Sequence, residues 1–367
     1  MKVIVSGGGT GGHIFPAVSI ANAIKKALPD TEFLFIGANG RMEMEKVPAE
    51  GYNIIGLPVR GFLRPLYHPK NIMVLLDLLR STFMAKKIIK EFNPDIAVGV
   101  GGYASAAALK AACSLGVPYV LQEQNGFAGV TNQKLAKHAR KICVAYPNME
   151  RFFPADRIVM TGNPVRQSLL ECEATVAEAR QAFGLDPERP TIFVTGGSLG
   201  ARSINESIAD GIERLESAKI QVLWQTGKAD GDKWNDIAAA KQTKLVHPTS
   251  FVTDMAKAYR AADVVISRSG AGAVNEICLI GKASILVPLP TAAEDHQTAN
   301  AKALSTKDAA ILVANSEAKQ KLVTEAINLI ANKDRIKAME EKAKAMGLFG
   351  AADTIAKIVI EEAKKKK

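Results

Sequence analysis

The sequence predicts an α/β protein of two doubly wound domains, each a parallel β-sheet with helices on both faces. Three observations predict this fold class. Short apolar runs alternate with amphipathic helical patterns along the chain, which is typical of parallel sheets. A strand, a glycine-rich turn and a helix pattern follow one another from Lys2 and again from Thr191. The length of 367 residues suits two domains better than one.

The first half begins with the apolar strand that leads into the first glycine turn. A helix is expected from Pro16 to Leu28, with Pro16 in its first turn, where proline is tolerated. The other strand candidates are continuous apolar runs, as in strands covered on both faces. Turn residues and a proline at Thr161–Arg166 indicate the junction with the second half. The strands predicted here are Lys2–Val5, Glu32–Ile36, Asp95–Val100, Pro118–Leu121 and Lys141–Val144.

The second half repeats this plan, with a second glycine turn at Gly196–Gly200. Its remaining segments alternate between apolar runs and helical periodicity. Ligands of such sheets bind outside the carboxyl ends of the strands, so we expect the turns of the two halves to face each other across a cleft. The strands predicted here are Ile192–Thr195, Ile220–Gln225, Leu245–Val246, Val264–Ser267 and Ser284–Pro288.

The composition favours an anionic partner other than nucleic acid. The formal net charge is +10, partly from the run Lys364–Lys367, which we interpret as a solvated tail. Nucleic acid is disfavoured because only 6% of the residues are aromatic and no run interleaves aromatic with basic residues. A nucleotide, a phosphorylated lipid or an anionic membrane surface fits the charge better.

The sequence also favours a reducing, intracellular setting. The four cysteines are far apart without CxxC spacing, which is typical of free thiols. The first residues form a strand rather than a signal peptide, and no apolar run reaches the ~18 residues that span a bilayer. We therefore expect a cytoplasmic protein that meets a membrane only from its surface.

The first glycine turn has the spacing of a dinucleotide-binding loop without the acid that such a site needs. Gly7, Gly9 and Gly12 match GxGxxG, but the second strand ends at Phe35–Asn39 with no carboxylate, which argues against NAD. His13 follows at the start of the helix, where the helix dipole favours the neutral imidazole. It is therefore either a proton acceptor or a polar cap residue.

Three further polar segments follow predicted strands. Gln122–Asn125 forms a site-like cluster, with a solvated loop as the alternative. Ser267–Glu276 is a third glycine-containing turn, whose small residues let a phosphate approach the backbone. Within it, Glu276 is suited either to bind a ribose diol or to favour the positive end of a helix. Glu294–Gln297 lacks HxxxH or CxxC spacing nearby, so no metal site is expected.

The segment Asn71–Lys90 is predicted to be a helix with more apolar surface than one buried face needs. An apolar helix with a basic rim suits an anionic membrane interface, and a core or interdomain helix is the alternative. The apolar residues are Ile72, Met73, Val74, Leu75, Leu76, Leu78, Leu79 and Phe83, and the basic ones around them are Arg60, Arg64, Lys70, Arg80, Lys86 and Lys87.

Taken in order, these motifs resemble the MurG family, the peptidoglycan N-acetylglucosaminyltransferases of glycosyltransferase family 28, which have the GT-B fold of two Rossmann-like domains. The resemblance covers essentially the whole chain and implies an enzyme of cell wall biosynthesis. Its reaction is the inverting transfer of N-acetylglucosamine from UDP-GlcNAc to the C4 hydroxyl of the muramyl sugar of lipid I, giving lipid II and UDP. The motifs are Gly8–Pro16, Gly101–Ser105, Glu123–Asn125, Gly162–Arg166, Gly196–Ala201 and Arg268–Glu276.

The resemblance also implies a role for each domain. Residues 1–164 form an acceptor- and membrane-binding domain, residues 165–345 bind UDP-GlcNAc, and a helix at Ala351–Ala363, within residues 346–367, returns to the first domain. The protein would be peripheral to the cytoplasmic side of the bacterial inner membrane. Its implied partners are UDP-GlcNAc, lipid I, the anionic membrane surface and other cell-wall synthesis proteins, and no cofactor is implied.

The implied donor site lies mainly in the second domain. Ser198 and the turn from Gly270 to Val274 hold the diphosphate, Glu276 holds the ribose, and Val252 meets uracil through its backbone. Gln122 and Asn275 depart from the residues common at their positions, histidine and a small polar residue, which puts their detailed contacts in doubt. The other implied donor-binding residues are Thr10, Gly11, Gly12, Asn125, Arg166, Ala271, Gly272, Ala273, Asn275 and Gln297.

The general base and the acceptor contacts are expected in the first domain. His13 is the first candidate for the base and Glu123 the second, and the resemblance does not settle which one acts. The implied acceptor-binding residues are Gly102, Tyr103, Ser105 and Gln124.

Two other functions stay open at this point. One is a UDP-GlcNAc 2-epimerase of the same two-domain architecture, and the other is a sugar-nucleotide sensor without catalysis. The turn at Tyr103–Ser105 and the apolar helix favour the transferase, because an epimerase needs neither an acceptor nor a membrane face.

Overall fold

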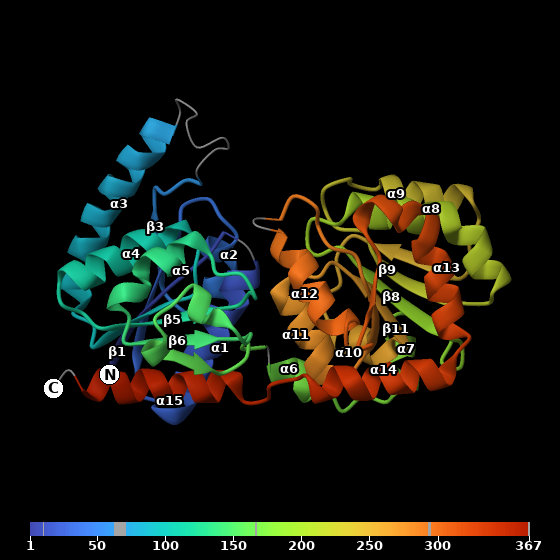
Figure 1. The fold of residues 1–367 in the computed structure, drawn as a ribbon. Coiled ribbons are helices and arrows are strands. Elements are labelled where there is room, and N and C mark those ends of the chain that lie inside the picture. Colours follow the sequence, from blue (N-terminus) through green and yellow to red (C-terminus); the bar gives the residue numbers. More distant parts are fainter. Residues whose placement is uncertain (10, 62–70, 166, 293–294, 366–367) are drawn as a thin grey trace. The chain divides into compact units, whose positions relative to one another are not determined.

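The computed structural model describes residues 1–9, 11–61, 71–165, 167–292 and 295–365 (Figure 1). Thr10 and Arg166 of the expected donor site, and Arg64 and Lys70 of the expected basic rim, lie outside the described residues. The chain divides into two compact units. Unit 1 comprises Met1–Arg166 with Leu348–Lys367, and unit 2 comprises Gln167–Gly347.

Unit 1 contains a parallel sheet of seven strands in the order β3-β2-β1-β4-β5-β6-β7. Two of these strands, β3 and β7, were not predicted, because they are short, lie at the edges and are only partly buried. The strands are β1 Lys2–Ser6, β2 Glu32–Ala38, β3 Ile54–Leu57, β4 Ile96–Gly99, β5 Tyr119–Glu123, β6 Lys141–Val144 and β7 Ile158–Met160.

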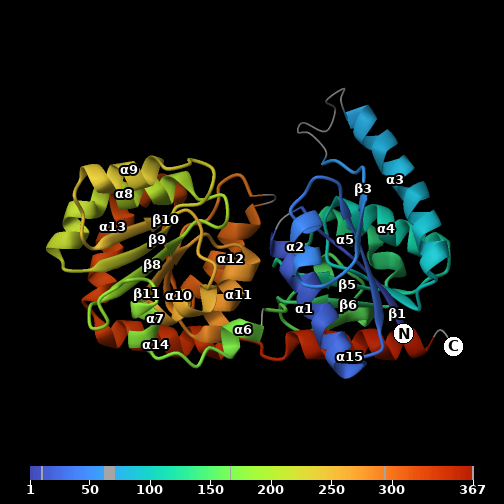
Figure 2. The same cartoon turned by 180° about the vertical axis from the view of Figure 1, so that it is seen from behind.

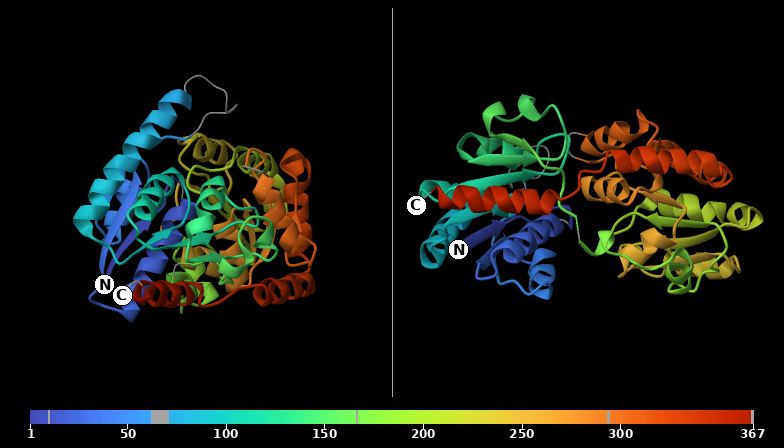
Figure 3. Two further views of the ribbon diagram at one scale, coloured as in Figure 1. Left: turned by 60° about the vertical axis from the view of Figure 1, so that its left-hand side comes forward. Right: turned by 90° about the horizontal axis from the view of Figure 1, so that it is seen from below.

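Helices cover both faces of this sheet (Figures 1 and 3). On one face α3 and α4 pack together over residues such as Ile4 and Leu121. On the other face α1 and α15 pack together over Val5 and Val98. The helices of unit 1 are α1 Gly11–Ala27, α2 Glu43–Ala49, α3 Asn71–Phe92, α4 Tyr103–Ser114, α5 Val130–Leu135 and α15 Ala351–Lys364, with 3-10 turns at Ala136–His138, Met149–Arg151 and Ala155–Arg157.

The start of α1 corrects the prediction that this helix begins at Pro16. The helix begins at Gly11, directly after the glycine turn, so Pro16 lies inside it. Since proline has no N–H, the carbonyl of Gly12 receives no helical hydrogen bond from it. The earlier start places His13 in the first turn of the helix, beside the glycine turn.

Unit 2 contains a parallel sheet of six strands in the order β10-β9-β8-β11-β12-β13. The five predicted strands are present with ends shifted by up to a few residues, and β13, with two residues, was missed. The two parallel sheets confirm the predicted α/β class. The strands are β8 Thr191–Thr195, β9 Gln221–Gln225, β10 Val246–Thr249, β11 Val264–Ser267, β12 Ala283–Leu286 and β13 Ile311–Leu312.

Helices also cover both faces of the sheet of unit 2 (Figure 2), and a hydrophobic core lies on each face. Helices α8, α9 and α13 cover one face around Trp224, and α10, α11 and α12 cover the other around Phe193. The helices are α6 Gln167–Leu170, α7 Val176–Gln181, α8 Arg202–Ser217, α9 Lys233–Ala240, α10 Met255–Ala261, α11 Ala271–Ile280, α12 His296–Ser305, α13 Ala318–Ile330 and α14 Lys333–Ala345, with a 3-10 turn at Asn315–Glu317.

Candidate functional site

The first glycine turn is held by a buried carboxylate that the sequence analysis did not single out. Glu43 is 0% exposed and begins α2, just beyond β2. Its Oε2 accepts the N–H of Gly9 over 2.9 Å, and its Oε1 accepts the N–H of Ala38 over 3.0 Å. A Cβ at Gly8 would lie 2.1 Å from Oε1, so this glycine makes room for the carboxylate. The signal in the sequence was an acid that opens the helix after β2, a few residues beyond the strand end.

His13 is held against the same turn. Its Nδ1 lies 3.1 Å from the carbonyl oxygen of Gly8. Because a carbonyl only accepts, Nδ1 carries the proton of this hydrogen bond, and in the neutral ring Nε2 carries the lone pair. The turn after β4 lies beside this nitrogen, since a Cβ at Gly101 would be 3.0 Å from Nε2. The structure thus places the imidazole between the turns that follow β1 and β4.

Glu123 has a different environment from His13. It ends β5, is 1% exposed, and both of its oxygens accept hydrogen bonds from the loop that follows. Oε1 accepts from the backbone N–H and Nδ2 of Asn125, and Oε2 accepts from the N–H of Gly129 and Nδ2 of Asn132, over 2.9 to 3.3 Å. This carboxylate closes the turn between β5 and α5.

A network of buried side-chain amides surrounds Glu123. Gln122 donates to Oδ1 of Asn163 over 2.9 Å, and Asn163 donates to the carbonyl of Gln124 over the same distance. Gln124 in turn donates to the carbonyl of Val100 over 2.8 Å, which ties β5 to the end of β4. Since buried amides of this kind hold one arrangement, the network fixes the carboxyl ends of these strands.

The four expected acceptor-binding residues differ in their access to a ligand. Gly102 caps α4 with a φ of 89°, and a Cβ there would lie 2.6 Å from the carbonyl of Gly8. Tyr103 is 47% exposed, whereas Ser105 and Gln124 are buried. Of this set, the Tyr103 side chain and the Gly102 backbone remain the groups that a ligand can reach. Their role stays a prediction.

In unit 2, the second glycine turn packs against the turn that follows β9. Gly200 has a φ of 88°, and a Cβ there would lie 2.1 Å from the carbonyl of Thr226. Ser198 is half-buried, and its carbonyl accepts the N–H of Lys228 over 3.1 Å. Gly197, with a φ of 87°, has nothing within 4 Å of a Cβ position. Space is therefore open beside the turn at Gly197, just ahead of α8.

Gln225, the last residue of β9, connects this turn to Val252. Its Nε2 donates to Oγ1 of Thr195 over 3.0 Å and to the carbonyl of Gly197 over 3.1 Å. Its Oε1 accepts the backbone N–H of Val252 over 2.9 Å. The backbone N–H of Val252 is thus engaged within unit 2. Gln225 is a further residue that the sequence analysis missed, because it closes an apolar strand.

The third turn joins β11 to α11 and is tied to α12. The Ser269 hydroxyl donates to the carbonyl of Gln297 over 2.8 Å, and Oε1 of Gln297 accepts the N–H of Leu289 over 3.0 Å. Gly272 has no positive φ and nothing within 4 Å of a Cβ position. Neither conformation nor packing requires a glycine there, so open space lies against the first turn of α11. Ala271 and Val274 are buried, and Ala273 and Asn275 are half-buried.

Arg268 places a positive charge at the carboxyl ends of the strands of unit 2. It donates to the carbonyls of Val287 and Pro288, to Oδ1 of Asn315 and to the Ser203 hydroxyl, over 2.7 to 3.2 Å. Burial lowers the pKa of its guanidinium to about 10. Within the described part of the chain no carboxylate forms an ion pair with it. This arrangement leaves the charge available to an anion.

Glu276 is oriented by a buried tyrosine. The hydroxyl of Tyr259 donates to its Oε2 over 2.9 Å, and the tyrosine ring packs edge-on against Phe193, with 5.6 Å between centroids. Tyr259 is the third residue of the site that sequence analysis missed. Gly11 and Gly12, expected on the donor side, form the start of α1 in unit 1, and Asn125 is half-buried beside Glu123.

Helix α3 exposes the apolar face that the sequence predicts. Ile72 is 68% exposed and Phe83 is 70% exposed, and the first turns of the helix stand clear of the rest of unit 1 in Figures 1 and 3. Val74, expected on the exposed side, is buried and anchors the helix to the unit. The Nζ atom of Lys86 lies 6.0 Å from the centre of the Phe83 ring. The other exposed apolar residues are Met73, Leu75, Leu76, Leu79 and Met84.

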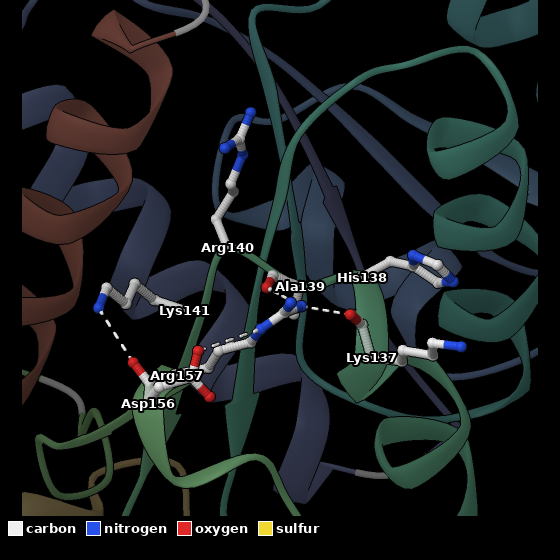
Figure 4. Close-up of a pocket in the computed structure, with 7 residues that line it drawn as sticks. All are labelled: Lys137, His138, Ala139, Arg140, Lys141, Asp156 and Arg157. Atoms are coloured by element: carbon white, nitrogen blue, oxygen red, sulfur yellow. Dashed lines mark hydrogen bonds and ion pairs between the residues drawn. The ribbon is translucent and has the colours of Figure 1, made fainter.

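A basic pocket lies at the other end of the unit 1 sheet, where β6 and β7 begin (Figure 4). Arg157 donates there to the carbonyl of Ala139 over 2.9 Å, and Lys141 donates to that of Asp156 over 3.5 Å. These bonds cap the preceding turns rather than extend the site at the carboxyl ends. Within the described ranges, no group of three or more His, Cys, Asp or Glu side chains is placed to hold a metal ion. None of the described helices is both long and apolar enough to cross a membrane.

Comparison with known families gives a match for both halves of the chain. Residues 3–144 match the glycosyltransferase family 28 N-terminal domain, and residues 191–357 match the glycosyltransferase family 28 C-terminal domain. Among curated proteins, the UDP-N-acetylglucosamine--N-acetylmuramyl-(pentapeptide) pyrophosphoryl-undecaprenol N-acetylglucosamine transferase of Bacteroides fragilis is 53% identical, over 98% of this chain and 95% of its own. The protein of the same name from Cytophaga hutchinsonii is 50% identical, over 98% and 95%.

Solved structures agree on the fold. MurG from Acinetobacter baumannii has a TM-score of 0.75 and 28% identity, covering 98% of this chain and 99% of its own. A putative UDP-N-acetylglucosamine 2-epimerase from Listeria monocytogenes has a TM-score of 0.73 at 16% identity, covering 100% and 97%, so that likeness concerns the fold alone.

Proposed function

The chain belongs to glycosyltransferase family 28, and we propose that it transfers N-acetylglucosamine from UDP-GlcNAc to the C4 hydroxyl of the muramyl sugar of lipid I, releasing lipid II and UDP. The relatives that carry this activity in their names match almost the full chain at about half identity. The epimerase alternative has only a likeness of fold in its favour. The observation that carries the proposal in the structure is the set of anion-attracting groups in unit 2.

We place the UDP diphosphate at the carboxyl ends of β8 and β11. The turn at Ser198, the start of α11 at Ala271–Val274 and the half-buried guanidinium of Arg268 surround this edge of the sheet. Helix N-termini and backbone N–H groups favour a phosphate, and the cation of Arg268, which has no ion pair among the described residues, adds to this potential. Gly197 and Gly272 leave the open space that a close approach of phosphate oxygens requires. Gln297 lies against the same turn and completes this part of the site.

We place the nucleoside beside this diphosphate. Glu276 is held by Tyr259 with one oxygen, and its carboxylate is suited to accept from the ribose hydroxyls. At Val252 the carbonyl is the backbone group that meets the uracil, since the N–H is donated to Gln225. A carbonyl accepts from the N3–H of uracil, a proton that cytosine lacks, so this contact favours uridine nucleotides.

In this proposal the reaction is a single displacement with His13 as the general base. Nε2 of His13 takes the proton of the C4 hydroxyl while the oxygen bonds to the anomeric carbon, and the bond from that carbon to UDP breaks on the opposite face. The sugar is therefore inverted, and UDP leaves with the bonding electrons. Preorganised donors that stabilise a leaving charge of this kind are worth about 3 kcal/mol each in the transition state.

His13 suits the role of base better than Glu123. Its hydrogen bond to Gly8 leaves the lone pair on Nε2, at the nitrogen that faces the turn after β4. Glu123 is buried, and four N–H donors occupy its two oxygens. Proton transfer to Glu123 would require breaking some of these bonds. We therefore assign Glu123 to holding the loop around Asn125.

We further propose that α3 binds the anionic cytoplasmic surface of the cell membrane, where lipid I is anchored. Its exposed apolar residues and its lysines match an interfacial helix. Binding to vesicles of anionic lipid should weaken as salt rises, because salt screens the lysine charges. The double variant Ile72→Ser, Phe83→Ser should lose binding, whereas Ile55→Ser, at an exposed apolar residue of β3, should keep it. Equal binding by both variants would contradict the assignment to α3.

The direct test of the function is a transfer assay with radiolabelled UDP-GlcNAc and a lipid I analogue. We expect label in the lipid product and release of one UDP for each sugar transferred. A parallel incubation without acceptor tests the alternative, because an epimerase converts UDP-GlcNAc by itself. Epimer formation there, with no label in lipid, would overturn the proposal. If the protein bound the nucleotide but catalysed neither transfer nor epimerisation, a sugar-nucleotide sensor would be the remaining function.

A further inference from the structure

We propose that Glu43 is a positioning residue for His13 and acts through the peptide group that joins Gly8 to Gly9. The N–H of this peptide belongs to Gly9 and donates to Oε2 of Glu43 over 2.9 Å. Its carbonyl belongs to Gly8 and accepts from Nδ1 of His13 over 3.1 Å. One peptide plane therefore has a carboxylate at one end and an imidazole at the other.

The geometry of a trans peptide allows both bonds at once, because its N–H and C=O point in opposite directions. A carboxylate on the N–H polarises the amide and makes its carbonyl a stronger acceptor, since linked hydrogen bonds strengthen one another. A carboxylate that accepts directly from a histidine Nδ1–H fixes the tautomer of the ring, as in a catalytic triad. Here the carboxylate has the same effect through an intervening peptide group. It holds the proton on Nδ1 and therefore leaves the lone pair on Nε2.

The packing around Glu43 shows that the fold holds this carboxylate in a defined position. Its second oxygen accepts from Ala38 at the end of β2, and the side chain is fully buried. A Cβ at Gly8 would lie 2.1 Å from Oε1, and one at Gly37 would lie 2.6 Å from Cγ of Glu43. Gly8 and Gly37 therefore make room for the side chain of Glu43 rather than for a ligand. The inference rests on the proposed function, which makes His13 the base.

The substitution Glu43→Gln tests this role, because it removes the charge and leaves one of the two amides without an acceptor. We expect kcat to fall by about 10- to 100-fold, by analogy with the loss on removing the hydrogen-bond partners that orient metal-bound histidines. The KM for UDP-GlcNAc should stay within about twofold, because the donor contacts assigned to unit 2 are unchanged. Glu43→Asp retains the charge at a shorter reach and should have an intermediate kcat.

The control for this substitution is Glu362→Gln. Glu362 is a buried glutamate of α15 in the same unit, and it pairs with Lys365 at 2.6 Å, away from the turn. Its loss should lower the thermal midpoint without changing kcat. A general loss of stability in unit 1 would lower kcat in both variants, whereas loss of positioning lowers it only at Glu43.

A second measurement follows the imidazole itself. In ¹⁵N NMR spectra of the full chain, the His13 signals are identified by their absence in His13→Asn. We expect the Nδ1–H form in the wild type and a mixture of both tautomers in Glu43→Gln. An unchanged tautomer together with a kcat within twofold of the wild type would overturn the proposal.

The two measurements separate this inference from the proposed function. A tautomer change in a protein that transfers no sugar would support the role of Glu43 and contradict the function. If Glu43→Gln shows no cooperative unfolding transition, Glu43→Asp is measured in the same two ways. An Asp variant with wild-type kcat and the wild-type tautomer would then overturn the inference.

Discussion

The two glycine turns have similar sequences but are held in different ways. The turn after β1 is fixed by the carboxylate of Glu43, which occupies the N–H of Gly9. The turn after β8 is fixed by the neutral amide of Gln225, and Arg268 bonds to Ser203 at the start of the following helix. We therefore expect a phosphate to be repelled from the first turn and attracted to the second. Glycine spacing admits a phosphate, but the groups behind the glycines decide whether one binds.

The largest effect is expected for the loss of His13, which tests whether the first turn serves the chemical step while the second turn binds the donor. His13→Ala should lower kcat by about 10²- to 10⁴-fold, the usual contribution of a general base. The KM for UDP-GlcNAc should change little, because the base acts on the acceptor hydroxyl. His138→Ala, an exposed histidine at the far end of the unit 1 sheet, is the control. Wild-type turnover in His13→Ala would exclude His13 as the base.

The next effect concerns the charge behind the second turn. Arg268→Met should weaken UDP binding by about 10- to 100-fold, since hydrogen bonds to charged groups contribute about 1.5–3 kcal/mol. Isothermal titration with UDP measures this loss, and the salt dependence of the affinity should decrease with it. Arg268→Lys keeps the positive charge but lacks the several N–H donors of a guanidinium. Its affinity for UDP should lie between those of the wild type and the Met variant. Unchanged UDP affinity in the Met variant would show that the diphosphate binds elsewhere.

A smaller effect comes from making the second turn resemble the first. Gln225→Glu places a carboxylate beside the carbonyl of Gly197 and should weaken UDP binding by about tenfold, which corresponds to about 1.4 kcal/mol. Uridine should lose less, because the carboxylate still accepts the N–H of Val252. Gln225→Met removes the contact to Gly197 as well as the contact to Val252, so it should weaken the binding of both uridine and UDP. Competition binding with uridine and UDP tests the difference. Equal losses for both ligands in Gln225→Glu would argue against separate roles.

The smallest effect compares two glycines. Gly272→Ala should raise the KM for UDP-GlcNAc severalfold, because the new methyl group enters the space assigned to the phosphate. It should not lower the thermal midpoint, since alanine is favoured over glycine in a helix by about 1 kcal/mol. Gly8→Ala should instead lower the midpoint, because its Cβ would meet Glu43. If both variants changed only stability, the space beside Gly272 would not belong to the donor site.

The strands that carry the turns could be predicted because each is an apolar run followed by glycine. The apolar pattern is less informative at short or edge strands, and β3, β7 and β13 were missed for this reason. The start of α1 was misplaced at Pro16, because proline is preferred in the first turn of a helix, whereas this helix already begins at Gly11, directly after the glycine turn. Local sequence therefore predicts the order of the elements better than their ends.

The residues that hold the site were harder to predict than those at its surface. Glu43 reaches Gly9, Gln225 reaches Gly197 and Tyr259 reaches Glu276, and each of these partners is distant in the sequence. The residues next to them in the chain do not indicate these partners. Glu123 was predicted as part of a polar cluster, but its burial depends on the fold of the loop around Asn132. The identity of a polar residue indicated a site, whereas its role depended on tertiary contacts.

The position of α15 has a consequence for how the chain folds during synthesis. Both ends of the chain belong to unit 1, and α15 packs against α1 (Figure 3). Unit 2 is continuous, so all of it leaves the ribosome before α15 does. Domains usually complete their folding in the order of synthesis. Here the unit that starts first must wait for the last helix, and α1 keeps an apolar surface uncovered until then.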